Sequence, residues 1–369
     1  MPHRLRVAII GLGIGRGHAR AFQNLPDKFE LAAVCDRDKA KARELAALGN
    51  APRVCTDLSE LCGMDDVDVI DISTPSFLHF EQTCEALSAG KHVICEKPLA
   101  SSLKEVDELT CAEAQSGRRI MPIFQYRFGH GLQKLKFLAD EGLTGRAYVT
   151  TVETAWRRRE DYYRLQPGAD AGRGWHGKWK TELGGTLATH AIHAHDMLTY
   201  ILGPIRSVFA RTATRVHPIE TEDCASVSLE MADGSLASLS VTVGSCEQIS
   251  RHRFCFSNLT AESNTRPCNS SDPWTFTGDS PQLCAQIEAA LARFIPEPEG
   301  FEGQFSRFYR ALQSGTELPV TLSDARTSIE LLTAIYASAR TAQAVKLPIG
   351  PEQPLYAGWL PPDYTLAAD

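Results

Sequence analysis

The stretch Gly11-Leu12-Gly13-Ile14-Gly15-Arg16-Gly17-His18 directly follows an apolar run, RVAII, at residues 6–10. A strand that passes through a glycine loop into a helix is typical of a dinucleotide-binding turn. One glycine permits the tight turn, and another lets the backbone approach a pyrophosphate without a Cβ in the way. The helix N-terminus behind the loop supplies N–H groups and partial positive charge. The usual spacing is GxGxxG. This loop reads GxGxG, so we expect Gly15 to take the place of the third glycine.

An acidic residue at the end of the next apolar run strengthens this interpretation. Asp36 follows residues 29–35 and lies 25 positions after Gly11, against the roughly 20 expected for a ribose-binding carboxylate. Such a carboxylate accepts hydrogen bonds from both ribose hydroxyls and repels a 2′-phosphate, which favours NAD. Arg37 offsets part of that repulsion, so NADP stays open. The structural alternative is a turn glycine cluster followed by an N-cap aspartate.

The first 125 residues alternate short apolar runs with helix-forming stretches. Strands are expected at residues 6–10, 29–35, 67–73, 92–95 and 119–124, and helices at 18–25, 38–48, 79–89 and 101–115. This alternation predicts βαβ units and a parallel sheet that is buried on both faces. We therefore expect a dinucleotide-binding domain over residues 1–125.

A different pattern begins near Tyr126 and predicts an α+β domain over residues 126–369. Helices are expected at 132–141, 184–202 and 325–343, and strands at 146–155 and within 205–258, where Ser235–Val243 alternates with period two. This favours an antiparallel or mixed sheet with helices on one face. Residues 260–282 are rich in Ser, Asn, Pro and Thr, so we expect an irregular excursion there.

Charge and composition exclude several classes of protein. The formal charge is 38 − 45 = −7, which disfavours nucleic-acid and membrane-surface binding. No apolar run is long enough to span a bilayer, and the N-terminus lacks an apolar signal segment, so a cytoplasmic protein is expected. The 11 cysteines are scattered and form no CxxC pair, which argues against a disulfide framework and a cysteine zinc site.

Three further segments carry a resemblance to a known family. They are residues 73–79 (STPSFLH), 90–100 (GKHVICEKPLA) and 184–196 (GGTLATHAIHAHD). With the glycine loop, they resemble the glucose–fructose oxidoreductase / inositol dehydrogenase family, Gfo/Idh/MocA. The resemblance implies a Rossmann domain, then an α/β domain with an open, mostly antiparallel sheet that is often used for homodimer or homotetramer contacts.

The resemblance also implies roles for individual residues. Lys97 of the Glu-Lys-Pro segment would lie beside the nicotinamide and the substrate, and the catalytic histidine falls on His193. The residues expected at the cofactor are Gly11, Gly13, Ile14, Gly15, Asp36, Arg37, Ser73, Thr74, Pro75, His79, Glu96 and Lys97. The residues expected at the substrate are Lys97, Arg127, Arg157, Tyr163, Trp175, His176, Lys178 and His193.

The chain departs from the family pattern at several positions. Ser76 replaces the usual Asn, Leu183 a glycine, and His176 the Arg of Trp-Arg-Gly. Most importantly, Thr189 stands where the family has an aspartate four residues before the histidine. Thr189 is expected on the same helical face as His193, but a hydroxyl cannot stabilise an imidazolium as an anion would. We expect Lys97 to carry more of the electrostatic stabilisation, or Glu182 or Asp196 to compensate.

These residue types suit the oxidation of an alcohol. Histidine removes the hydroxyl proton near neutral pH, and the Lys97 ammonium stabilises the developing alkoxide. Lys97 and His193 fall in separate predicted domains, so the pocket is expected between them. The aromatic and basic segment 156–180 suits sugar rings, although its tryptophans equally suit a core or an interface. His190, His193 and His195 do not share one helical face, so no metal is expected.

The sequence therefore predicts an NAD(P)-dependent dehydrogenase acting on CH–OH groups of a sugar, polyol or sugar derivative. Two alternatives remain open. One is an NAD-dependent glycosidase of the same fold, which releases an aglycone without net NADH. The other is a cofactor-binding regulatory protein without turnover, which the replacement of the aspartate by Thr189 permits.

Overall fold

A computed structural model describes residues 3–49, 51–163 and 174–361. The chain divides into two compact units, Met1–Gln125 with Gly300–Arg326, and Tyr126–Glu299 with Thr327–Asp369. This division differs from the expected one because residues 300–326 belong to the first unit. The reason lies in packing: Phe305 stacks on Phe22, with ring centroids 4.3 Å apart, and so joins a late helix to the first helix of the chain.

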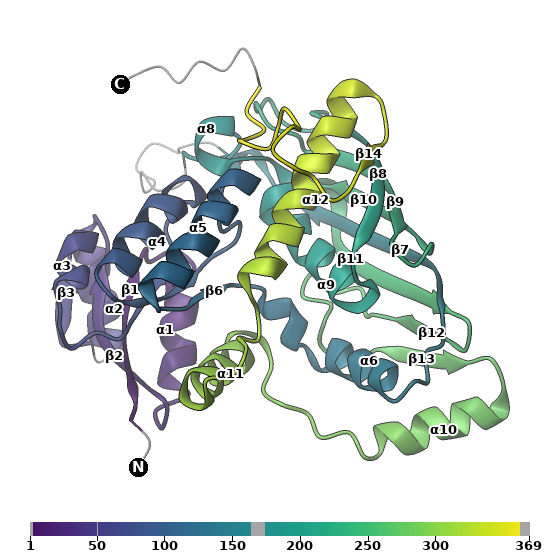
Figure 1. The fold of residues 1–369 in the computed structure, drawn as a ribbon, viewed down its shortest axis with the longest axis horizontal. Helices are drawn as coiled ribbons and strands as arrows, with labels where there is room; N and C mark the ends of the chain where they lie inside the picture. The colour runs from purple at the N-terminus through teal and green to yellow at the C-terminus, as the bar shows by residue number, and fades with distance from the viewer. Residues whose placement is uncertain (1–2, 50, 164–173, 362–369) are drawn as a thin grey trace. The chain divides into compact units, whose positions relative to one another are not determined.

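The first unit contains a parallel sheet whose strand order is β3-β2-β1-β4-β5-β6 among the described residues (Figure 1). Its strands are β1 Leu5–Ile10, β2 Phe29–Cys35, β3 Arg53–Cys55, β4 Val69–Ile72, β5 His92–Cys95 and β6 Ile120–Pro122. This is the Rossmann order, in which ligands bind at the carboxyl ends of the strands where the order reverses. The expected parallel sheet of a Rossmann domain is thereby confirmed. Sequence reasoning missed β3, which is too short to show a period.

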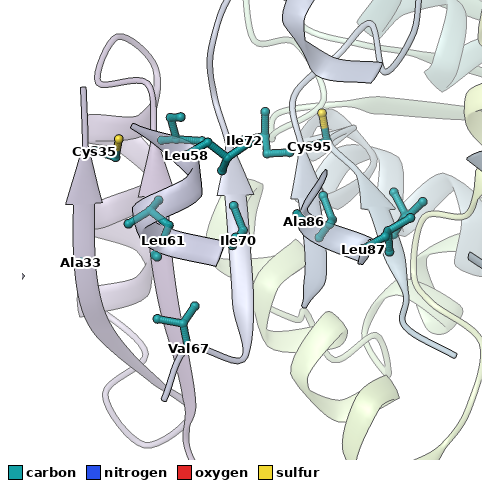
Figure 2. Packing of buried hydrophobic residues seen from close by; sticks show 14 of the residues in the cluster. Ala33, Cys35, Leu58, Leu61, Val67, Ile70, Ile72, Ala86, Leu87 and Cys95 are labelled. Carbon is teal, nitrogen blue, oxygen red and sulfur yellow. The ribbon is translucent and has the colours of Figure 1, made fainter. Parts of the chain in front are cut away.

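Helices cover this sheet, so its central strands are buried. They are α1 Gly15–Gln23, α2 Lys39–Gly49, α3 Leu58–Cys62, α4 His79–Ser88, α5 Leu103–Ser116 and α11 Gly300–Ser314, with a short turn at Ser76–Leu78. Figure 2 shows Leu61 of α3 and Ala86 of α4 packed near Ile70 of β4. All three are fully buried, and each large apolar side chain buried in this way contributes roughly 1.5–3 kcal/mol.

The second unit contains a sheet of order β13-β12-β11-β7-β10-β9-β8-β14 within the described part of the chain. Its strands are β7 Ala147–Arg157, β8 Ile205–Ala213, β9 Cys224–Met231, β10 Leu236–Thr242, β11 Gly244–Phe256, β12 Leu259–Glu262, β13 Thr275–Gly278 and β14 Val345–Lys346. The pair β10 and β7 is parallel and the other described pairs are antiparallel. The expectation of a mostly antiparallel sheet is confirmed.

One face of this sheet is buried and the other is exposed. Along β9, Val227 and Leu229 are buried, while Ser226 and Ser228 are exposed. The helices of the second unit are α6 His130–Asp140, α7 Glu160–Tyr163, α8 Trp179–Glu182, α9 Ile192–Leu202, α10 Pro281–Leu291 and, from Thr327 onward, α12 Leu322–Thr341, with turns at Gln125–Phe128 and Leu187–Ala191. No helix in the described ranges is long and apolar enough to cross a membrane.

The expected irregular excursion at residues 260–282 is wrong in part. Strand β12 overlaps its first residues, and β13 lies within it and forms an edge of the sheet. Local composition disfavours strands there, but β11 offers a row of backbone hydrogen-bonding groups that a short segment can pair with.

Candidate active site

The glycine loop between β1 and α1 forms a cradle. Gly11 has φ = +88°, and a Cβ there would lie 2.5 Å from the carbonyl oxygen of Ser73. A Cβ on Gly15 would lie 3.1 Å from Cγ2 of Ile9, so Gly15 allows the helix to pack closely on the strand. Around Gly13, by contrast, no described atom lies within 4 Å of an added Cβ. The space at Gly13 therefore suits a ligand that approaches the backbone.

The start of α1 fits an anionic group at this cradle. The first turn of the described helix contains no acidic residue, and Ile14 provides no side-chain cap. The first N–H groups of a helix lack intrahelical partners and carry partial positive charge. Ile14 is 49% exposed beside them. The loop thus fits the pyrophosphate of a dinucleotide, with Gly13 and the first turn of α1 as the residues that would hold it.

Asp36 lies at the carboxyl end of β2 and is tied to the glycine loop. Its Oδ2 accepts a hydrogen bond from the Leu12 N–H at 3.0 Å, and its Oδ1 accepts one from the Asp38 N–H at 2.9 Å. Each carboxylate oxygen has a further lone pair, so both can also accept from a ribose. The neighbouring Arg37 is exposed.

Two segments expected at the cofactor are joined by one buried histidine. The ring nitrogens of His79 lie 2.8 Å from the carbonyl oxygens of Pro98 and Thr74. His79 therefore connects the Ser73-Thr74-Pro75 segment, after β4, with the Glu-Lys-Pro segment, after β5. The peptide bond between Lys97 and Pro98 is cis.

A buried charged cluster lies behind the glycine loop, and sequence reasoning missed it. Nδ1 of His18 lies 2.8 Å from Oδ2 of Asp71, and its Nε2 lies 3.2 Å from Oε1 of Glu96. His18 and Asp71 are fully buried, and Glu96 is 5% exposed. Burial lowers the pKa of His18, but the charges and hydrogen bonds of Asp71 and Glu96 outweigh it and raise that pKa to about 10. The sequence did carry one sign of this cluster, because Asp71 is a carboxylate within an otherwise apolar run, VIDI at residues 69–72.

In the second unit, His193 lies on α9 with 7% of its surface exposed. Its ring stacks on Tyr126, with centroids 4.3 Å apart and planes 14° apart. Oη of Tyr126 lies 2.9 Å from Sγ of Cys268. The stacked phenol fixes the plane of the imidazole. Tyr126 was not among the expected site residues.

Arg127 is engaged in a buried ion pair. Its Nε and Nη2 donate to the two carboxylate oxygens of Asp196 at 2.7 and 2.5 Å. The two side chains are 6% and 2% exposed. Asp196, one of the two acids expected to compensate for Thr189, therefore has a cation of its own.

Thr189 belongs to a directional hydrogen-bond chain. Nε of Arg158 donates to Nε2 of His190 at 2.8 Å. Because a guanidinium only donates, Nδ1 of His190 carries the ring proton and donates to Oγ1 of Thr189 at 2.7 Å. Thr189 in turn donates to the Gly185 carbonyl at 2.8 Å. Arg158 thus fixes the tautomer of His190, and the Thr189 hydroxyl accepts from the protonated nitrogen.

Thr189 and His190 lie on a π-helical turn, Leu187–Ala191, that directly precedes α9. Such turns are rare and frequent at functional sites. At the start of this turn, the carboxylate of Glu222 accepts hydrogen bonds from the N–H groups of Gly185 and Leu187, both at 3.0 Å. Burial raises the pKa of Glu222 to about 7. Leu183, where the family has a glycine, has φ = 64°, a conformation that favours glycine.

An aromatic and histidine cluster occupies part of the segment expected to bind substrate. The ring of His176 lies 4.1 Å from that of Tyr162 and 3.8 Å from that of Trp175. Its Nδ1 lies 2.7 Å from Oε1 of Glu182, the second acid expected to compensate for Thr189.

The other residues expected at the substrate lie differently. Tyr163 contacts the ring of His217, whereas Arg157 and Lys178 are exposed. Residues 164–173 of this segment lie outside the described residues. In the ranges that the structure describes, no group of three or more His, Cys, Asp or Glu side chains could hold a metal ion.

Comparison with known proteins gives two family matches along the chain. Residues 5–124 match the oxidoreductase family with an NAD-binding Rossmann fold, and residues 132–257 match the Gfo/Idh/MocA C-terminal domain. Together these matches cover more than half of the chain.

Individual relatives agree with these matches. The chain is 36% identical over 147 residues to an inositol 2-dehydrogenase of Rhodococcus erythropolis (39% of this chain, 42% of the relative). It is 32% identical over 218 residues to the D-glucoside 3-dehydrogenase of Escherichia coli (58% of each chain). Both alignments span less than two thirds of the curated relative.

A solved structure covers more of the chain. The WlbA dehydrogenase of Bordetella pertussis, in complex with NADH and UDP-GlcNAcA, has a TM-score of 0.81 and 29% identity (94% of this chain, 100% of that chain). The expected NAD-binding oxidoreductase fold is confirmed. The chain belongs to the Gfo/Idh/MocA family of NAD-binding oxidoreductases.

Proposed function

We propose that this dehydrogenase oxidises a secondary alcohol of a sugar, polyol or sugar derivative. The observation that supports it most is the arrangement in the first unit. There the empty space at Gly13, the Asp36 carboxylate and the Glu-Lys-Pro segment all follow the carboxyl ends of parallel strands. The names of the relatives, an inositol dehydrogenase and a glucoside dehydrogenase, support a polyhydroxylated substrate.

Two residues supply the proton and charge chemistry in this proposal. A bound nicotinamide supplies the hydride acceptor. Lys97 donates a hydrogen bond to the substrate oxygen and stabilises the negative charge that develops there. His193 accepts the hydroxyl proton, and its stack with Tyr126 holds the ring in one plane.

The test is NADH formation, followed at 340 nm, with a panel of inositols, glucosides, uronates and UDP-linked uronates. Lys97→Met and His193→Gln are each expected to lower kcat at least about 100-fold, as expected when a proton-transfer or charge-stabilising group is lost. The double variant is expected to lose much less than the product of the two effects, because both residues act on one oxygen. Lys104→Met, an exposed lysine on α5, is the matched control and is expected to retain full activity.

The same panel separates the alternatives. Release of an aglycone from a glycoside without net NADH would identify the glycosidase. Binding of NADH without turnover of any substrate would identify the regulatory protein and would contradict the proposal.

For the substrate class, we propose a sugar derivative that carries a carboxylate. The WlbA relative is in complex with a UDP-linked acidic sugar, and the exposed Arg157 and Lys178 provide positive charge near the aromatic segment in sequence. Aromatic faces such as that of Trp175 stack on the C–H faces of sugar rings. Uronates are therefore expected to give a higher kcat/KM than inositols, and Arg157→Gln is expected to reduce that preference.

We propose that a second copy of the chain packs on the exposed face of the eight-stranded sheet. Leu236 is 55% exposed and Val149, its partner in register on the neighbouring strand, is 42% exposed. Exposed apolar residues in such neighbouring positions are typical of interfaces. Sedimentation velocity is expected to show a dimer or tetramer, and Leu236→Arg is expected to shift it toward the monomer.

A further inference from the structure

Glu96, the residue before Lys97, contacts a buried histidine of the same unit. The backbone N–H of Lys97 donates to Oε2 of Glu96 at 3.1 Å. The other oxygen of the same carboxylate, Oε1, lies 3.2 Å from Nε2 of His18. Glu96 therefore connects a buried imidazole on α1 to the backbone of Lys97.

Each ring nitrogen of His18 faces a carboxylate. Its Nδ1 faces the carboxylate of Asp71, with both oxygens at 2.8–3.0 Å, and a carboxylate accepts only. Nε2 faces a second carboxylate, and an imidazolium is the form of the ring that donates to both carboxylates at once. Oγ of Ser73 lies 3.3 Å from both Nδ1 of His18 and Oδ1 of Asp71.

Two aromatic rings also contact His18. The rings of Phe301 and Phe305 on α11 lie 4.3 and 5.4 Å from the imidazole, both edge to face. Among the described residues, the charged groups that act on the pKa of His18 are Asp71 and Glu96. In a site without water access, the attraction between an imidazolium and two carboxylates is much stronger than at the surface.

We propose that His18, as an imidazolium held by Asp71, is a positioning residue for Lys97 and acts through the carboxylate of Glu96. The inference rests on the proposed function, since it assigns a purpose to the orientation of Lys97. His18 lies behind the phosphate loop, on the helix that begins at Gly15, so the same helix that would receive the cofactor also sets the lysine. Loss of one proton from His18 would remove the positive charge that faces Glu96 and would weaken the hold of His18 on that carboxylate.

The position of Lys97 can be followed without turnover. Reductive ¹³C-methylation keeps each lysine charged and gives every lysine an NMR signal, and Lys97→Arg assigns the one of interest. The imidazole signal of His18 is assigned in the same way with His18→Gln. We expect the wild-type Lys97 signal to show no transition near pH 6–8 that follows a histidine.

Asp71→Asn is the decisive variant because it removes the larger of the two raising influences on the pKa of His18. The His18 titration is expected to move down by about 2 pH units, as for the loss of an opposite charge within hydrogen-bond distance. The Lys97 signal is expected to acquire a transition at the same pH. If the Lys97 signal is insensitive to the protonation of His18, the proposal is overturned.

A second variant and a control guard against a purely structural effect. His18→Gln is expected to change the Lys97 signal at every pH and to reduce its response to added NADH. His92→Gln, a substitution at the opposite end of the strand that leads to Lys97, is expected to leave that signal unchanged. If His18→Gln leaves the Lys97 signal as in the wild type, or His92→Gln shifts it equally, His18 does not position the lysine.

These outcomes are separable from the proposed function. If Lys97→Met retains full dehydrogenase activity while the two NMR signals titrate together, the role of Lys97 in catalysis is wrong. The coupling between His18 and Lys97 would then still hold.

Discussion

Substitution by alanine should affect a different property at each of two glycines in the same loop: the stability of the protein at Gly11 and the affinity for NADH at Gly13. At Gly11 an added Cβ would lie 2.5 Å from the Ser73 carbonyl oxygen and 2.7 Å from the Thr74 nitrogen, and φ is +88°. These neighbours are backbone atoms of the strand-to-loop junction and cannot rotate away. The left-handed backbone costs roughly 1–2 kcal/mol for a non-glycine residue, and overpacking adds about 1–3 kcal/mol. Gly11→Ala is therefore expected to destabilise the protein by about 3 kcal/mol.

At Gly13 the folded protein has room for the same methyl group. No described atom lies within 4 Å of the added Cβ, so the stability of Gly13→Ala is expected to stay within about 1 kcal/mol of the wild type. The methyl group would instead occupy space that a pyrophosphate needs. We expect the Kd for NADH to rise at least about tenfold, which corresponds to about 1.4 kcal/mol.

Urea unfolding and a titration of NADH fluorescence measure the two effects separately. Gly11→Ala is expected to shift the unfolding midpoint, and Gly13→Ala to shift the NADH titration with an unchanged midpoint. Gly142→Ala is a control for the left-handed conformation alone, because it has φ = 73° with no described atom within 4 Å of its Cβ. Unaltered NADH affinity in Gly13→Ala would refute the assignment of this cradle to the pyrophosphate.

Three further predictions concern charge. Burial, with the charge of His252, lowers the pKa of His195 to about 3, and neither ring nitrogen has a hydrogen-bond partner among the described residues. Because His195 takes up its proton near pH 6.5 in the unfolded chain, its contribution to the free energy of unfolding is fully present above that pH and is about 2 kcal/mol smaller at pH 5. In urea titrations, His195→Leu should therefore lose less stability between pH 6.5 and pH 5 than the wild type. Parallel pH profiles for the two proteins would contradict this prediction. Asp196→Asn removes the negative charge that faces the buried Arg127 guanidinium and should lower the free energy of unfolding by about 3 kcal/mol in the same assay. Asp140→Asn, the control at an exposed ion pair, should lower it by less than about 1 kcal/mol. Asp36→Ala removes the repulsion of a 2′-phosphate and should lower the ratio of the Kd for NADPH to that for NADH about tenfold; an unchanged ratio would show that Asp36 does not select the cofactor.

Local sequence predicted much of the first unit because its elements are set by short-range patterns. Strand β2 and strand β5 begin and end where the apolar runs do. The glycine loop, Asp36 and the Glu-Lys-Pro segment each follow such a run, so their common edge of the sheet follows from the parallel βαβ arrangement alone. The sequence does not predict that residues 300–326 belong to the first compact unit, since nothing local shows that Phe305 stacks on Phe22.

The pairings within the site depend on contacts between distant parts of the chain. His18 meets Asp71 across 53 residues and Glu96 across 78, and no periodicity in the sequence encodes such a meeting. Thr189 was expected to face His193 from a regular helix, but the π-helical turn changes the spacing of side chains there, and its hydroxyl bonds to His190 and Gly185. The chain's own pattern of apolar residues and glycines thus determined the Rossmann architecture and where a dinucleotide would lie. Only the tertiary structure decided which buried groups share protons, because close packing and the exclusion of water, which no local propensity encodes, set those partnerships.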